Sequence, residues 1–352
     1  MPAILPHPIA TMLHDGQLIP AHPLALHDDG TLDEQRQRAL SRYYLAAGAG
    51  GLAVAVHTTQ FGIRLAGLLE PVLRLAAEEA ASAARPVILI AGVSGPGEQA
   101  VAEAELAAGY GYHLAMVILR GLDDLSEDEL VDHIAAIGEV IPVFGFYLQP
   151  DVGGRHLGPD FWARLARLPC VAAIKIAPFS RYYTQDVVRA VCESPRADRI
   201  ALYTGNDDAI LHDLLTPFTY RVDGRLVTKR ITGALIGQAA VWTHTAVQLL
   251  QQAHAAVRAG RVPTELLTVA SQWTDANAAL FDPVHRFAGS IAGVHEVLRR
   301  QGLLANLRLL DPCEGLSEGQ AAQIDRVTAA YPHLQDDTFV AAQLDQWLRN
   351  SR

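Results

Sequence analysis

One lysine in an apolar segment is the residue of this sequence best suited to covalent chemistry. Lys175 lies in CVAAIKIAP, residues 170–178, near the carboxyl end of a run typical of a buried strand. Among 28 lysine and arginine residues only two are lysines, Lys175 and Lys229. Arginine keeps its proton in proteins, whereas a desolvated lysine can release its own and attack a carbonyl carbon. Lys175 is therefore a candidate Schiff-base lysine, and a lysine that ends a strand or pairs with a carboxylate is the alternative.

Eight short apolar segments, separated by amphipathic helical segments, would position such a lysine. The expected strands cover residues 16–26, 51–57, 86–91, 112–118, 142–148, 171–176, 199–203 and 231–237. Continuous apolar strands that alternate with helices are typical of a parallel sheet buried on both faces. Eight such units over about 240 residues favour an α/β fold of the (β/α)8 TIM barrel type, with a doubly wound sheet as the runner-up.

Two regions lie outside these eight units. Residues 218–230 carry Asp223-Gly224 between alternating apolar residues, which is a hairpin signal, and they interrupt the unit between the seventh and eighth strands. Residues 263–352 are expected to be helical over 264–280, 283–301, 318–331 and 338–349. We therefore expect a barrel over residues 1–262, with a hairpin-like insertion, and a C-terminal helical extension packed on it.

In a barrel, side chains at the carboxyl ends of the strands converge on one site. The expected strand ends place these candidates there: His57, Thr58, Thr59, Tyr147, Lys175, Gly205 to Asp207 and Gly233 to Gly237. A lysine amine can condense with a ketone, a tyrosine can carry protons, and threonine hydroxyls with backbone N–H groups can hold a carboxylate. Tyr147 could equally be a core tyrosine, and Asp207 could simply stabilise the start of a helix.

The composition limits the possible partners and locations. The chain has 352 residues, of which 50% are hydrophobic. Its net charge of −10 argues against nucleic acid or an anionic membrane surface as the main partner. No charge-free run of 18 apolar residues and no basic leader is present, so we expect a cytoplasmic protein without a membrane span. Three scattered cysteines and 14 histidines show no metal-ligand spacing, and no metal or cofactor is expected.

Five segments, in order, resemble the dihydrodipicolinate synthase / N-acetylneuraminate lyase family of class I pyruvate aldolases. They are HTTQ at 57–60, FYLQP at 146–150, AAIKIAP at 172–178, YTGNDD at 203–208 and NAALFDP at 277–283. Each segment is weak alone, but together they extend the resemblance over residues 17–312. The resemblance implies a barrel, a homo-oligomer (dimer or tetramer) and a substrate, pyruvate or another 2-oxo acid, bound as an imine.

The resemblance also assigns roles to individual residues. Lys175 would form the Schiff base, Tyr147 would relay protons, and Thr58 would be the hydrogen-bond partner of Tyr147. Thr59 would hold the substrate carboxylate with local backbone N–H groups. Further substrate-binding positions would be His57, Gly205, Asn206, Ile236 and Arg155.

Several residues depart from the family pattern and affect the expected substrate. His57 stands where the family usually has glycine, and the loop after the fourth strand lacks the family's tyrosine. The family's substrate-binding arginine falls on Val152, with Arg155 near but out of register. Lysine biosynthesis is therefore not expected, and Arg120 or Arg155 is a hypothetical binder of an anionic part of another substrate.

The sequence thus predicts a Schiff-base lyase or aldolase that acts on pyruvate or another 2-oxo acid. The same iminium chemistry would also serve a 2-keto-3-deoxy sugar acid dehydratase or a hydratase–aldolase. A non-catalytic homologue that binds a metabolite is an alternative from another class, and a metal-dependent barrel aldolase is a third, for which no ligand cluster is visible.

Overall fold

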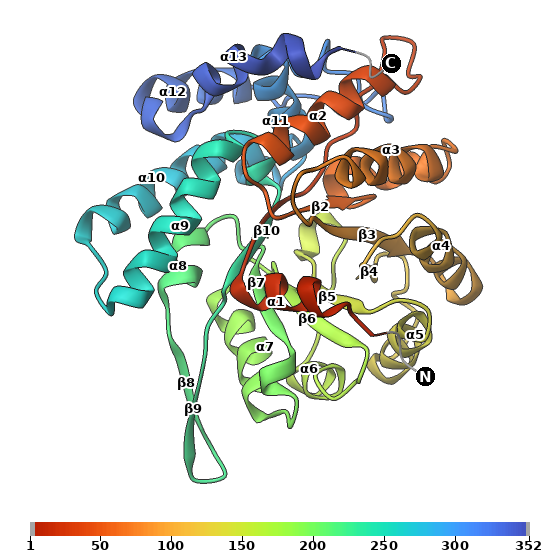
Figure 1. Cartoon of the computed structure of the whole chain (residues 1–352), viewed down its shortest axis with the longest axis vertical. Helices are drawn as coiled ribbons and strands as arrows, with labels where there is room; N and C mark the ends of the chain where they lie inside the picture. Colours follow the sequence, from red (N-terminus) through yellow and green to blue (C-terminus); the bar gives the residue numbers. More distant parts are fainter. Residues whose placement is uncertain (1–3, 350–352) are drawn as a thin grey trace.

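Eight parallel strands form a ring at the centre of the computed structural model, which describes residues 4–349 (Figure 1). The strands are β1 (Leu18–Pro20), β2 (Gly51–Val54), β3 (Ile88–Ser94), β4 (Leu114–Ile118), β5 (Val143–Tyr147), β6 (Val171–Ile176), β7 (Ala201–Thr204) and β10 (Gly233–Ile236). Their order is β1-β10-β7-β6-β5-β4-β3-β2, and a parallel bridge between Ala21 and Ala53 joins β1 to β2. The strand order follows the chain around the ring, so the (β/α)8 barrel is confirmed and the doubly wound sheet is excluded.

The first strand is shorter than the sequence indicated. An extended run was expected over residues 16–26, but β1 ends at Pro20. Gly16 has a positive φ of 84°, which starts the strand late, and Pro23 has no N–H to donate to a neighbouring strand.

Helices cover the outside of the barrel. They are α2 (Glu34–Ala46), α3 (Leu69–Ala81), α4 (Gly97–Gly109), α5 (Glu127–Gly138), α6 (Pro159–Leu165), α7 (Arg181–Glu193), α8 (Ile210–Leu215) and α9 (Thr243–Ala259). α5 begins with a capping box, in which Ser126 and Glu129 satisfy each other's backbone N–H groups. Each helix follows a barrel strand, so helix and strand apolar faces meet in a layer outside the ring.

Apolar side chains fill the barrel on both sides of the strands. Residues such as Ile90, Met116 and Phe144 point into the ring, and the alternate positions pack against the helices. The N-terminal helix α1 (His7–Asp15) lies across the amino ends of the strands, where Ile9 and Leu13 join the inner cluster (Figure 1). The end opposite α1 is therefore the one at which a cavity can open.

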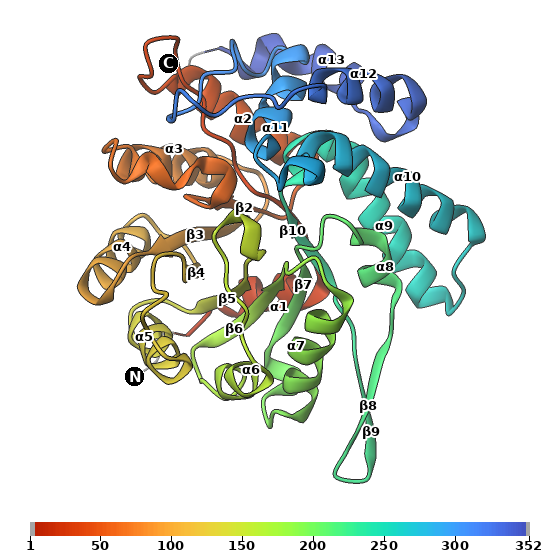
Figure 2. The ribbon, with the colours of Figure 1, turned by 180° about the vertical axis from the view of Figure 1, so that it is seen from behind.

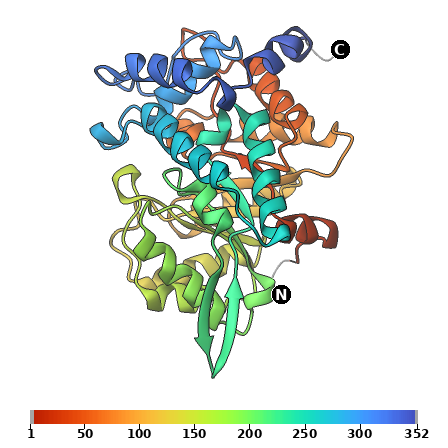
Figure 3. The same cartoon turned by 90° about the vertical axis from the view of Figure 1, so that its left-hand side faces the viewer.

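The insertion and the C-terminal helices lie on different sides of the barrel. β8 (Phe218–Val222) and β9 (Arg225–Lys229) form an antiparallel hairpin that projects from the body (Figures 1 and 3). The C-terminal helices are α10 (Thr264–Phe281), α11 (Ser290–Arg300), α12 (Gln320–Ala330) and α13 (Asp337–Trp347). They lie together over α2 and beside α8 (Figure 2). Among residues 4–349, every helix is too short or too polar to cross a membrane.

We predict that Gly233→Ala destabilises the barrel. An added methyl group would overlap the ring of Tyr203, a fully buried side chain that cannot move away. Overpacking of this kind costs roughly 1–3 kcal/mol. Urea unfolding measures it, with Gly109→Ala as the matched control, because a methyl group at Gly109 meets open space. Equal stabilities for the two variants would contradict the packing described for the ring.

Candidate active site

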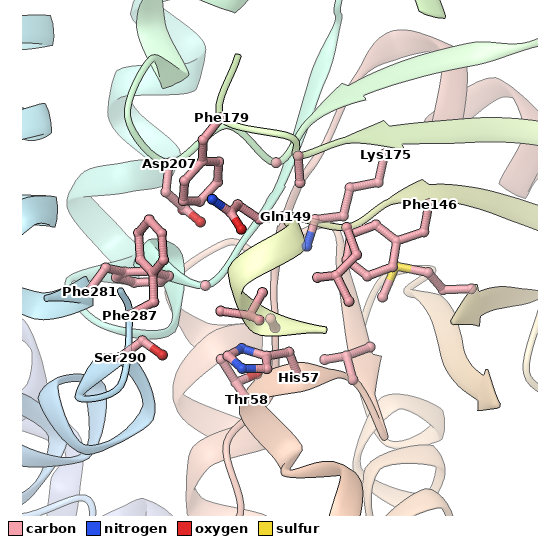
Figure 4. Close-up of a pocket in the computed structure, with 18 residues that line it drawn as sticks. His57, Thr58, Phe146, Gln149, Lys175, Phe179, Asp207, Phe281, Phe287 and Ser290 are labelled. Carbon is pink, nitrogen blue, oxygen red and sulfur yellow. The ribbon is translucent and has the colours of Figure 1, made fainter. Parts of the chain in front are cut away.

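A cavity opens at the carboxyl ends of the barrel strands (Figure 4). Its volume is about 50 Å³, where one water occupies roughly 10–15 Å³ by the same measure, so it admits a group of a few heavy atoms. Most of its lining is apolar. The polar side chains at its wall are His57, Thr58, Gln149, Lys175, Asp207 and Ser290.

Lys175 reaches this cavity from β6, and only 8% of the residue is exposed. Paired residues of adjacent parallel strands share a face, and Lys175 is paired with Phe146 of β5 and Tyr203 of β7. All three therefore point into the ring. The Lys175 ammonium lies 4.6 Å from the centroid of the Phe146 ring. Burial lowers the pKa of Lys175 to about 8, although the charge of Asp207 acts in the opposite direction.

Asp207 faces the cavity from the loop between β7 and α8 and is only 5% exposed. One carboxylate oxygen accepts a hydrogen bond from the backbone N–H of Gln238 at 3.2 Å. Burial raises the pKa of Asp207 to about 7, against the opposing effect of the Lys175 charge. Sequence reasoning nominated this position but gave it no chemical role. The structure makes Asp207 a carboxylate of the same cavity as the lysine.

Gly205 leaves room for the Lys175 side chain. A methyl group at Gly205 would overlap the stem of Lys175. Gly205 lines the cavity, as predicted, but its contribution is the space that it leaves for the amine chain.

The turn after β2 brings two of its three predicted residues to the cavity. His57–Thr59 forms a single 3-10 turn, and His57 and Thr58 line the wall. Thr59 does not line it, because its hydroxyl donates to the carbonyl of His22 at 2.6 Å and accepts from the N–H of Val56. Its role is to hold the turn. The first N–H groups of a helical turn have no partner within it, so they can face a ligand.

His57 is buried beside the lysine. Burial, and then the positive charges of Lys175 and Arg120, lower the pKa of His57 to about 4. The imidazole is therefore neutral at neutral pH. Figure 4 shows it pointing into the cavity from the side opposite β6.

Tyr147 does not line the cavity in this structure, so its position gives no support to the predicted role as the proton relay. Side chains alternate along a strand, and because Phe146 points inward, Tyr147 points outward into the helical layer. There its ring lies 4.9 Å from that of Trp162, and burial raises its pKa to about 12. For the same reason Thr58 has no hydrogen bond to Tyr147; its hydroxyl faces the carbonyl of His22 at 3.4 Å.

Three other predicted substrate-binding residues serve the scaffold instead. The guanidinium of Arg155 donates to the backbone carbonyls of Leu122 and Leu125, so it holds the loop after β4. Asn206 donates to Thr184 and Asp213 and accepts from the N–H of Phe179, which fixes the loop that carries Asp207. Ile236 packs in the helical layer, and its neighbour Gly237 lines the cavity.

Phenylalanines that sequence reasoning missed close the cavity. Phe146, Phe179, Phe281 and Phe287 all line it, and the rings of Phe179 and Phe287 meet edge to face at 5.4 Å. Phe179 and Phe287 have positive φ angles of 51° and 66°, which are uncommon for bulky residues. Strained backbone of this kind is concentrated at functional sites. The segment NAALFDP, which ends in Phe281-Asp282-Pro283, was the one sequence signal for this wall.

A larger polar cleft of about 730 Å³ adjoins the cavity and shares His57, Val152, Phe287 and Ser290 with it. Arg120 lies in its wall, with its guanidinium 5.2 Å from the centroid of the Phe61 ring. The segment after α11 also lines the cleft, through Leu310, Asp311 and Glu314. The N–H of Leu310 donates to Gln60 at 2.7 Å, so the C-terminal extension is fastened to the rim of the site.

A (β/α)8 barrel with one buried lysine at the carboxyl end of its sixth strand has the architecture of a class I lyase. The family model for the "Dihydrodipicolinate synthetase family" matches residues 15–220. The chain belongs to this family, whose members are Schiff-base lyases that use pyruvate.

Curated relatives of two activities match the chain. The 4-hydroxy-tetrahydrodipicolinate synthase of Azoarcus sp. is 26% identical over 222 residues, which are 61% of this chain and 74% of the relative. The N-acetylneuraminate lyase of Citrobacter koseri is 28% identical over 201 residues, 56% of this chain and 65% of the relative. Because two activities match at similar identity, the substrate does not follow from these relatives.

Solved structures agree in fold. The dihydrodipicolinate synthase of Agrobacterium tumefaciens superposes with a TM-score of 0.71 at 18% identity, covering 92% of this chain and 99% of that chain. The YagE protein of E. coli K12, solved in complex with pyruvate, gives 0.71 at 19% identity and covers 91% and 98%. At these identities the likeness supports the fold alone.

We predict that Tyr147→Phe leaves catalysis intact, because the phenol lies outside the barrel. The rate at which the protein exchanges the methyl protons of pyruvate for deuterium, followed by NMR, should change less than about twofold, whereas loss of a proton carrier costs about 10²–10⁴-fold. Phe161→Leu, another change in the outer layer, controls for effects of packing. A hundredfold loss in folded Tyr147→Phe would restore Tyr147 to the site.

Proposed function

We propose that this protein is a lyase or aldolase that binds a 2-oxo acid, pyruvate first, as an imine on Lys175. The observation that carries the proposal is a buried lysine of lowered pKa in a cavity of fitting size. At neutral pH a larger fraction of its amine is free than for an exposed lysine, and the free amine is the nucleophile. The membership of the family supports the same chemistry.

The steps follow from the geometry around the amine. The Lys175 nitrogen adds to the carbonyl carbon of the oxo acid, and loss of water leaves a protonated imine. We propose that the carboxylate is held by the N–H groups of His57 and Thr58 and by the Thr58 hydroxyl, because the turn that carries them lines the cavity. In cleavage, the bond between the carbon next to the iminium and the following, hydroxyl-bearing carbon breaks, and the iminium accepts its electron pair. That hydroxyl loses its proton to a base in the site, and the products are an enamine and an aldehyde. In the reverse direction the enamine attacks an aldehyde.

Aldol cleavage or condensation is the first reaction that we propose, and dehydration of a 2-oxo acid is the second, since both use the same iminium. Lysine biosynthesis is not proposed, because the loop after β4 has no tyrosine and Arg155 is occupied by backbone carbonyls. A homologue that only binds a metabolite would occupy the same cavity without a covalent bond.

We further propose that the polar cleft receives the second part of the substrate and that Arg120 holds an anionic group there. No ion pair or hydrogen bond engages its guanidinium within the described part of the chain, and Gly153 leaves room for its side chain. Asp311 and Glu314 line the same cleft, and the charge of Arg120 acts on Glu314, so a bound anion would compete with these carboxylates for the guanidinium.

We predict that sodium borohydride with pyruvate traps a reduced adduct on Lys175. The chain has two lysines, so peptide mass spectrometry can assign the label. Lys175→Met should abolish the adduct. Lys229→Met is the matched control, because Lys229 lies on the hairpin and donates to the Ala197 carbonyl.

If pyruvate gives no adduct, 2-oxobutyrate and 2-oxoglutarate would be tried in the same way. Failure with all three, on protein with an unchanged circular dichroism spectrum, would refute the imine mechanism. Saturable binding of the oxo acid without an adduct would then favour the metabolite-binding protein.

We predict that Arg120→Ala discriminates between charged and neutral aldehydes. With pyruvate as donor, kcat/KM for 4-carboxybenzaldehyde should fall about 10–100-fold, as expected for the loss of a charged hydrogen bond, while that for benzaldehyde changes less than about threefold. Arg286→Ala is the control, because Arg286 lines the same cleft but is paired with Asp151. Equal losses for the two aldehydes would exclude anion binding by Arg120.

A further inference from the structure

The imine mechanism requires a proton carrier, and the position beside the lysine cannot supply one. Dehydration of the carbinolamine needs a proton on its hydroxyl, and enamine formation from bound pyruvate needs a base for a methyl proton. The residue in register with Lys175 on β5 is Phe146, which has no exchangeable proton.

The tyrosines near the ring cannot take this role. Tyr147 faces the helical layer. Tyr203 points into the ring, but its hydroxyl donates to the Leu13 carbonyl at 2.9 Å and accepts from the N–H of Gln17 at 3.1 Å. Those contacts lie at the amino ends of the strands, under α1, and so away from the cavity.

The titratable side chains that line the cavity, among residues 4–349, are His57, Lys175 and Asp207. Lys175 is the nucleophile, so the carrier is His57 or Asp207. His57 also lines the polar cleft, and its ring lies 5.7 Å from that of Phe61, centroid to centroid. Its lowered pKa makes it a weak base and leaves it almost without a proton to donate at neutral pH.

Asp207 is held as a pre-oriented carboxylate. Gln238 binds one oxygen. Hydrogen bonds to α8 fix the loop, because Asn206 and Thr204 both donate to the buried carboxylate of Asp213. Among residues 4–349 no cation forms an ion pair with the Asp207 carboxylate. Lys175 and Asp207 line the same cavity, and each charge affects the pKa of the other group.

We infer that Asp207 is the catalytic acid and base of this site, in place of a tyrosine hydroxyl. Protonated Asp207 donates to the carbinolamine hydroxyl, which leaves as water and gives the iminium. The resulting carboxylate removes a proton from the adjacent carbon to give the enamine, and returns it when the iminium re-forms. Proton and electron counts balance within the site, so no further reactant is needed. This inference depends on the proposed imine function.

Asp207→Asn tests it, because asparagine keeps the oxygen that accepts from Gln238. Two rates are compared on the same protein: trapping of the imine by borohydride, and exchange of the pyruvate methyl protons for deuterium. If borohydride trapping shows that another 2-oxo acid forms the imine, that acid is used in place of pyruvate in both measurements. We expect a trapped adduct on prolonged incubation, and exchange slowed about 10²–10⁴-fold. Asp208→Asn is the matched control, because Asp208 is the exposed neighbour and does not line the cavity.

The pH profile separates a proton carrier from a binding residue. The base must be ionised, and the profile is measured at saturating pyruvate, where Lys175 is already held as the imine and its own titration does not contribute. Wild-type exchange should then fall about tenfold per pH unit below the pKa of Asp207, which burial raises to about 7 in the free protein. Asp207→Asn should lose this limb, and Asp207→Glu should keep it at a lower rate.

Three results would overturn the inference. Wild-type protein that forms no adduct would refute the imine function, and the role of Asp207 with it. A normal adduct with an unchanged exchange rate and pH profile in Asp207→Asn would refute the role of Asp207 alone. If His57→Gln instead loses proton exchange and its pH dependence, the role of proton carrier passes to His57. A raised KM with unchanged kcat would make Asp207 a substrate-binding residue only.

Discussion

The burial of one amine and one carboxyl group in the same cavity is the constraint on which the rest of the site depends. Water exclusion moves the pKa of Lys175 down and that of Asp207 up, towards neutrality from opposite directions. The phenylalanines keep water out, and Gly205 leaves the amine chain the room to reach its position. The packing of the barrel must meet the cost of burying both groups. Lys175 lies on β6, and Asp207 lies on the loop that directly follows β7.

The barrel and its lysine could be predicted from the sequence because both leave local signals. Eight apolar segments and the rarity of lysine are visible without any knowledge of contacts. The face on which Tyr147 lies leaves no such signal. In VFGFY every residue is compatible with burial, so no polar alternation marks the inner face, and a shift of one residue exchanges the two faces. The pairing of Phe146 with Lys175 resolves the ambiguity, and it is a property of the folded sheet.

The rest of the site could not be predicted because distant segments build it. Phe281 and Phe287 come from the C-terminal helical region, and Leu310 binds Gln60 across 250 residues of chain. Arg155 was expected at the substrate from its distance along the chain, but it is bound to carbonyls of a neighbouring loop. Sequence spacing therefore located the strands and the lysine, but it predicted poorly which face a strand residue occupies and what the loops place over the strand ends.

The scarcity of lysine has a consequence for the chemical resilience of the molecule. Aldehydes damage proteins by condensing with exposed amines, and arginine, which is always protonated at physiological pH, is a far poorer target. Apart from the chain terminus, this protein offers an aldehyde two amines: one sits in the cavity, and the other, Lys229, is partly buried with its nitrogen held by a backbone carbonyl. A chain so poor in amines can work in a high local concentration of aldehyde without accumulating adducts on its surface.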